Sequence, residues 1–222
     1  MMKSKYRTVG TVAPHESAHL HVSGRAQYTD DIPEWQGTLY GAFGLSERAH
    51  ARITKLDLSK VRSAPGVVAV ITVEDVPGDK YIGAAKADEP VLADGLVEYY
   101  GQPMFAVAAT SYDLAHRAVK LAEVEYEDLH PVLDVQEGAE KESYVLPPVR
   151  IAQGDMEGKL NAGPHRHQGS FYCGGQEQFY LEGQVSYAVP GEDGEMQLFA
   201  STQHPTEMQL MISHVLHQPS HT

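Results

Sequence analysis

Cysteine is almost absent from this chain of 222 residues, because Cys173 is the only one. A single cysteine excludes an internal disulfide and any metal centre built from several thiolates, and it favours a reducing compartment. No apolar run reaches the roughly 20 residues of a membrane-spanning helix, and the N-terminal MMKSKYRTVGT lacks the apolar segment of a signal peptide. We therefore expect a cytoplasmic protein that does not enter membranes.

Positive charge is also scarce. The chain has 17 lysine and arginine residues against 30 aspartate and glutamate residues, which gives a formal net charge of −13. The basic residues are spread thinly and form no stripe, so the phosphate backbone of a nucleic acid would be repelled on average. Nucleic acid is therefore not an expected partner.

Several catalytic motifs are missing. The chain has no Gly-x-Ser-x-Gly elbow for a serine nucleophile and no glycine-rich loop of the kind that cradles phosphate. Twelve histidines are present, and His165 and His167 would share one strand face, but none of the spacings matches a known metal site. We expect solvated or hydrogen-bonding histidines.

The first half predicts a compact α+β unit. Alternating or β-branched apolar residues indicate strands within 37–59, 67–73, 101–110 and 123–129. A helix is expected directly after Ser111, because this serine, or Asp113, can cap an apolar stripe with helical spacing.

The second half changes composition. Residues 137–165 are rich in glycine, proline and mixed charge, which indicates a linker or wrapping segment. Strands are expected in 165–175, where Cys173 would be a buried structural thiol, and in 183–202 around an Asp-Gly turn. Pro205 and the apolar stripe that follows predict a helix to Leu216.

The stretch LFASTQHPTE places Gln203 between the last predicted strand and this helix. A glutamine at the end of a strand has to satisfy its side-chain amide. Ligands in α/β architectures tend to bind beyond the carboxyl ends of strands. From the residues alone, Gln203 is therefore either a turn contact or a ligand contact.

Six motifs resemble one family. They are SGRAQYTDDIP (23–33), AHARITKLDLSKVRSAPGVVAVITVEDVPG (49–78), EPVLADGLVEYYGQPMFAVAA (89–109), VEYEDLHPV (124–132), GGQEQFYLE (174–182) and STQHPTEMQ (201–209). In this order they resemble the molybdenum-binding subunit of the xanthine dehydrogenases, within the molybdenum hydroxylase superfamily. The resemblance implies an N-terminal arm (1–19), an α/β hammerhead domain (20–135), a linker (136–165) and the incomplete start of a molybdopterin-binding domain (166–222).

The resemblance also implies a chemistry, the hydroxylation of hypoxanthine and xanthine to urate at a molybdenum–molybdopterin centre. Electrons would pass through iron–sulfur clusters and FAD, held by a partner subunit or domain, to NAD. Gln203 would donate a hydrogen bond to the oxo ligand of the molybdenum. For Gln176, in the signature motif GGQE, a structural role in bracing the same strands and a cofactor contact both stay open. The family's general-base glutamate is expected beyond residue 222, so the chain alone is expected to bind no cofactor and to be inactive.

Two alternatives stay open. The chain could serve as a non-catalytic module for subunit docking or dimerisation, within a homo- or hetero-oligomer. It could also belong to a molybdenum hydroxylase whose substrate is an aldehyde or another N-heterocycle.

Overall fold

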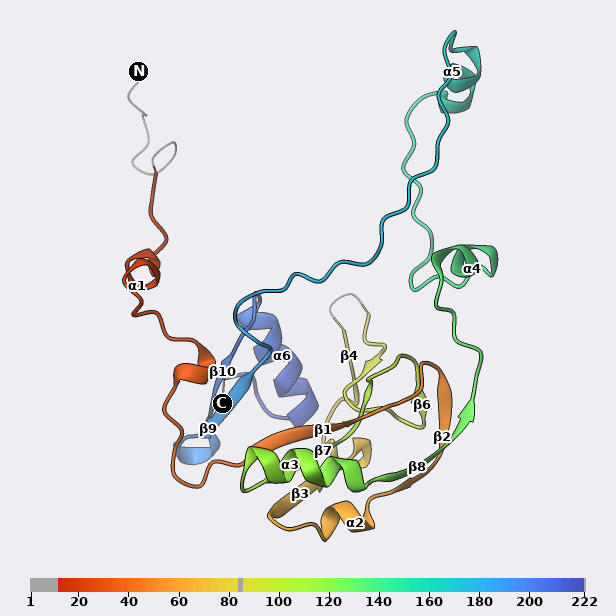
Figure 1. Ribbon diagram of the computed structural model, residues 1–222. Helices are drawn as coiled ribbons and strands as arrows, with labels where there is room; N and C mark the ends of the chain where they lie inside the picture. Colours follow the sequence, from red (N-terminus) through yellow and green to blue (C-terminus); the bar gives the residue numbers. More distant parts are fainter. Residues whose placement is uncertain (1–11, 84–85, 222) are drawn as a thin grey trace.

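The computed structural model describes residues 12–83 and 86–221, and it confirms the predicted α+β class (Figure 1). Its helices are α1 (Ala18–Val22), η1 (Thr29–Asp31), α2 (Ser59–Arg62), η2 (Val73–Asp75), α3 (Tyr112–Ala118), η3 (Val119–Leu121), α4 (Val135–Glu140), α5 (Met156–Ala162), η4 (Glu192–Gly194) and α6 (Pro205–Leu216), where η marks a short 3-10 helix. Its strands are β1 (Tyr40–Leu45), β2 (Ala51–Asp57), β3 (Val67–Ile71), β4 (Tyr81–Ile82), β5 (Glu89–Pro90), β6 (Leu96–Val97), β7 (Pro103–Ala109), β8 (Glu123–Asp128), β9 (Ser186–Pro190) and β10 (Met196–Ala200). Within these described ranges, none of the helices is long and apolar enough to cross a membrane.

The hydrophobic core is shared by two sheets and α3, since it includes Val107 of β7 as well as Ala51 of β2. The first of these sheets is the one against which α3 packs. The sheet has the order β1–β7–β3, with both outer strands antiparallel to β7, and α3 packs against β1 and β7. Phe105 is fully buried on this face and lies opposite Gly44 in the register. A β-carbon at Gly44 would lie 2.0 Å from a carbon of the Phe105 ring, so the glycine makes room for the ring.

Complementary charges line a second antiparallel sheet, of order β6–β2–β8. The basic residues belong to β2 and its flanks, and the acidic residues belong to β8. The pairs are Arg48–Asp128 at 3.0 Å, Arg52–Glu127 at 3.8 Å, Lys55–Glu125 at 3.4 Å, and Lys60–Glu123. Because these side chains are largely exposed, each pair contributes little to stability, and their shared effect is to favour this pairing of strands.

Side-chain caps begin α3 and α4. The hydroxyl of Ser111 accepts a hydrogen bond from the Leu114 N–H at 3.3 Å, which confirms that α3 begins after this serine. In α4 the carboxylate of Asp134 accepts hydrogen bonds from the N–H groups of Gln136 and Glu137, at 2.8 and 3.2 Å.

Residues 141–185 form a long arm that carries α5 far from the sheets (Figure 1). The strand predicted in 165–175 is wrong, since the arm contains no strand along its described length. Cys173 is accordingly exposed, not buried. A strand needs a neighbour to pair its backbone, and none of the described residues pairs with this segment, so Phe171 stays 92% exposed and Phe179 93% exposed.

The chain returns from the arm into a hairpin and a helix, as predicted. Strands β9 and β10 pair antiparallel across a turn in which Asp193 and Gly194 both have positive φ, 54° and 88°. Helix α6 then runs from Pro205 to Leu216 and ends at His217, which adopts the left-handed conformation at φ 51°. The hairpin and α6 follow one another in the chain, and α6 packs against β4 of the first half.

Candidate functional site

Gln203 lies on a bend of four residues between the end of β10 and the start of α6. The strand ends at Ala200 and the helix begins at Pro205, which is the arrangement expected from the sequence. The side chain of Gln203 is exposed.

Two neighbours of Gln203 use their side chains to hold the backbone of the bend. Thr202 Oγ1 accepts a hydrogen bond from the His204 N–H at 3.1 Å. His204 Nδ1 in turn accepts from the Glu207 N–H at 3.1 Å and so caps α6. This cap uses the lone pair of the ring nitrogen Nδ1.

The amide of Gln203 makes no hydrogen bond to any residue in the described part of the chain. An amide NH₂ is a double donor and its oxygen is an acceptor, so the group suits an oxygen-rich ligand. Gln203 thus lies on the bend with its amide unbonded within the described residues, and its role as a ligand contact stays a prediction.

Gln176 lies in the long arm of residues 141–185. Its side chain is exposed in the arm and makes no hydrogen bond to the rest of the described residues, so the prediction that it braces the hairpin strands is wrong. The segment around it runs without strand partners, and a brace needs a neighbour.

Two contacts between distant parts of the sequence hold the hairpin unit against the first half. The Thr29 N–H donates to Glu182 Oε1 at 3.0 Å, and the Trp35 N–H donates to the hydroxyl of Tyr187 at 3.0 Å. Figure 1 shows segment 29–38 passing beside β9 and β10. Sequence reasoning missed both contacts, because each joins a backbone N–H to a side chain about 150 positions away and leaves no local pattern.

The end of α6 forms a third contact with the first half. The Asp79 N–H donates to the carbonyl oxygen of His214 at 3.0 Å, and the two side chains approach to 3.4 Å. Contacts at Glu182, at Tyr187 and at the end of α6 thus link the hairpin and α6, with Gln203 between them, to the first half.

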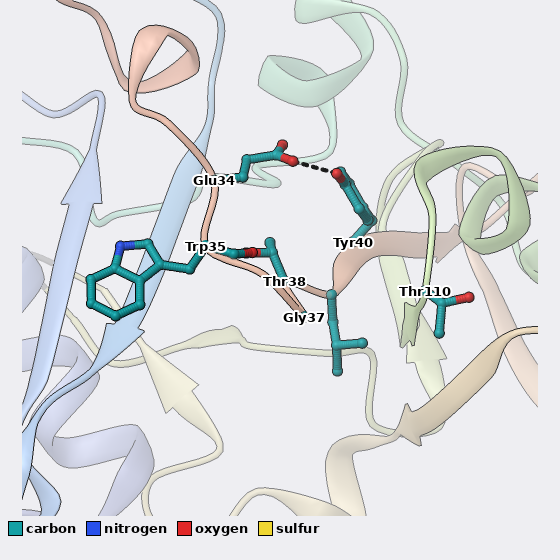
Figure 2. A pocket seen from close by; sticks show the side chains of 7 residues that line it. Glu34, Trp35, Gly37, Thr38, Tyr40 and Thr110 are labelled. Atoms are coloured by element: carbon teal, nitrogen blue, oxygen red, sulfur yellow. Dashed lines mark hydrogen bonds between the residues drawn. The ribbon is translucent and has the colours of Figure 1, made fainter.

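A shallow hollow of about 290 Å³ lies beside the strap formed by residues 29–38 (Figure 2). In Figure 2, Glu34 and Tyr40 point toward one another across its rim, and the Tyr40 hydroxyl donates to Glu34 Oε2. This hydrogen bond, with the negative charge of Glu34, raises the pKa of Tyr40 above its ordinary value. The phenol of Tyr40 therefore stays protonated. Gln203 does not line this hollow, and we interpret the hollow as part of the contact between the strap of residues 29–38 and the first sheet.

Direct metal binding by protein side chains is not supported. The described residues contain no cluster of three or more histidine, cysteine, aspartate or glutamate side chains that could hold a metal ion. His165 and His167 are exposed in the arm, as expected of solvated histidines.

Comparison with known families gives two matches along the chain. Residues 23–130 match the family described as aldehyde oxidase and xanthine dehydrogenase, a/b hammerhead domain. Residues 136–222 match the molybdopterin cofactor-binding domain. Together with the fold, these matches place the chain among the molybdenum hydroxylases.

Proteins of similar sequence agree with these family matches. The chain is 40% identical over 214 residues to the xanthine dehydrogenase/oxidase of Gallus gallus and 41% identical over 216 residues to the xanthine dehydrogenase of Drosophila subobscura, in each case over 96% of this chain. It belongs to the aldehyde oxidase and xanthine dehydrogenase family. The chain spans 16% of the length of these curated relatives.

Solved structures show the same fold. The aldehyde oxidoreductase from Desulfovibrio gigas superposes with a TM-score of 0.80 at 25% identity, over 94% of this chain and 25% of its own. The quinoline 2-oxidoreductase from Pseudomonas putida 86 gives a TM-score of 0.80 at 24% identity, over 96% of this chain and 29% of its own.

Proposed function

We propose that this chain is part of the molybdenum-binding subunit of a xanthine dehydrogenase that converts hypoxanthine and xanthine to urate. Its sequence relatives support this proposal, and the free amide of Gln203 on the bend between β10 and α6 is the structural observation that carries it. The proposed organisation is an N-terminal segment (1–19), a hammerhead domain (20–135), a linker (136–165) and part of a molybdopterin-binding domain (166–222).

The residues present fit a molybdopterin group, because Gln203 offers hydrogen-bond donors and no described cluster competes as a metal site. When bound, the molybdenum centre would supply an activated water oxygen for hydroxylation and accept the electrons. Gln203 would donate from its amide to an oxygen of the cofactor and so orient it. FAD and iron–sulfur clusters would reside in a partner subunit or domain, and we assign no catalytic base within this chain.

The test is a pair of glutamine variants in the intact enzyme that carries this chain. Gln203→Ala should lower kcat for xanthine by about 100-fold, since the loss of one oriented donor has an effect of that order. Gln197→Ala is the matched control, because Gln197 is an exposed residue of the preceding strand β10. Unchanged turnover in Gln203→Ala would refute the assignment of Gln203.

Substrate and cofactor content are measured in the same preparations. Turnover of aldehydes or of other N-heterocycles without turnover of xanthine would replace the proposed substrate. The 222-residue chain by itself should contain no stoichiometric molybdenum and show no turnover, and a loaded, active preparation would contradict this expectation. A chain that binds its partner subunit but never a cofactor would support the docking alternative.

A further inference from the structure

The last rung of the β9–β10 ladder differs from the regular pattern. Two residues directly opposite one another in an antiparallel sheet commonly exchange both backbone hydrogen bonds. The Ser201 N–H donates to the carbonyl oxygen of Val185 at 3.2 Å, as expected. The Val185 N–H, however, donates to the hydroxyl oxygen of Ser201 at 3.3 Å. The side chain of Ser201 thus takes the place of its own backbone carbonyl.

The same hydroxyl makes a second contact. It donates to the carbonyl oxygen of Gly183 at 2.8 Å, so one small group serves as acceptor and donor toward two points of the opposing chain. Serine and threonine are the small side chains that provide both functions from one atom. Alanine would leave the Val185 N–H and the Gly183 carbonyl without this partner.

We propose that Ser201 is a positioning residue for Gln203. Because its hydroxyl completes the ladder, the backbone of Ser201 is free to leave the strand direction, and the chain bends before Pro205. The opposing segment is held in turn through Glu182, which accepts from the Thr29 N–H. The backbone of the bend that carries Gln203 is therefore tied to the first half of the protein.

The first test needs no cofactor. Hydrogen exchange is measured on the 222-residue chain for the Val185 amide and for residues 202–204. Ser201→Ala should speed this exchange by about 5- to 10-fold, the equivalent of one lost hydrogen bond, and Ser201→Thr should restore it. Ser170→Ala is the matched control, since Ser170 is exposed in the arm. Wild-type exchange in Ser201→Ala, or failure of threonine to restore it, would overturn the proposal.

The second test uses the intact enzyme and rests on the proposed function of Gln203. Ser201→Ala should lower kcat with little change in KM, and it should have no further effect when Gln203 is already alanine. Fully additive effects would overturn the positioning role. If the Gln203→Ala variant keeps wild-type turnover, the proposed function fails, but the exchange result for Ser201 on the isolated chain still stands or falls by itself.

Discussion

The N–H of Gly78 donates a hydrogen bond to the carbonyl oxygen of Val215 at 3.0 Å, which ties the loop after η2 to the last turn of α6. The two backbones approach so closely that a β-carbon at position 78 would lie 1.9 Å from the carbonyl oxygen of His214. Backbone atoms cannot move aside as a flexible side chain does, so this contact requires glycine.

Replacement of Gly78 by alanine should therefore loosen α6 from the sheet unit. We expect a destabilisation of about 1–3 kcal/mol, typical of an overpacked site, together with faster proteolysis near the C-terminus. Urea unfolding and limited chymotrypsin digestion would measure both effects, since α6 offers cleavage sites such as Leu210 and Leu216. Gly41→Ala is the control, because a β-carbon at Gly41 meets nothing within 4 Å. Equal stability of the two variants would contradict the steric argument.

Phe105 should be among the most sensitive residues of the core. It is fully buried, and Phe105→Ala should destabilise the protein by about 3–5 kcal/mol through lost burial and the cavity left behind. Phe43→Ala, on neighbouring β1, should have a much smaller effect because Phe43 is 58% exposed. Denaturant titration of both variants would check this. Similar losses of stability in both variants would contradict the assignment of Phe105 to the buried face and of Phe43 to the exposed face of the sheet.

The stability of the protein should depend on Asp75 in acid. Asp75 Oδ2 accepts hydrogen bonds from the N–H and the hydroxyl of Thr72, at 2.8 and 2.9 Å, and these bonds lower the pKa of the Asp75 carboxyl. The pKa of this carboxyl is thus lower in the folded state than in the unfolded state, where it is near 4. The stabilisation from Asp75 is therefore complete above the pKa of the unfolded state, and it is lost as the pH falls through the pKa of the folded state.

The variant Asp75→Asn removes this titration. Urea midpoints measured from about pH 5 down to about pH 3 should fall less steeply in this variant than in the wild type. Asp193→Asn, at the exposed hairpin turn, should keep the wild-type slope. Parallel slopes for all three proteins would show that Asp75 does not contribute.

The imidazole cap of α6 is open to a direct test. His204→Ala removes the acceptor for the Glu207 N–H and should destabilise α6 by about 1 kcal/mol, whereas His204→Asn should retain most of the cap. Amide exchange in the first turn of α6 would report the effect. His167→Ala, in the exposed arm, should leave this exchange unchanged, and equal exchange in the alanine and asparagine variants would contradict capping by His204.

Elements with strong local signals could be predicted from the sequence. Pro205 at the first helical position and the apolar stripe behind it gave the bounds of α6, and Ser111 gave the start of α3. The Asp193–Gly194 pair located the hairpin turn, because both positions need positive φ. In each case the physical cause lies within a few residues of the element.

The errors occurred where structure depends on a partner distant in the sequence. The residues around Cys173 have a composition typical of a strand, but no chain lies beside them to accept their backbone hydrogen bonds. The position of Gln203 on the bend was predictable, whereas its support by Ser201 was not, since that support depends on Val185 and Gly183 across the hairpin. The function of Gln203 itself stays a prediction.

The distribution of buried residues has a consequence for synthesis of the chain on the ribosome. Among the described residues, the buried hydrophobic side chains all fall between Ala42 and Ala118, and β8 ends at Asp128. Because translation proceeds from the N-terminus, both three-stranded sheets are complete before the arm leaves the ribosome. The first half therefore folds while the residues that carry Gln203 are still being made, and the bend is assembled onto it afterwards.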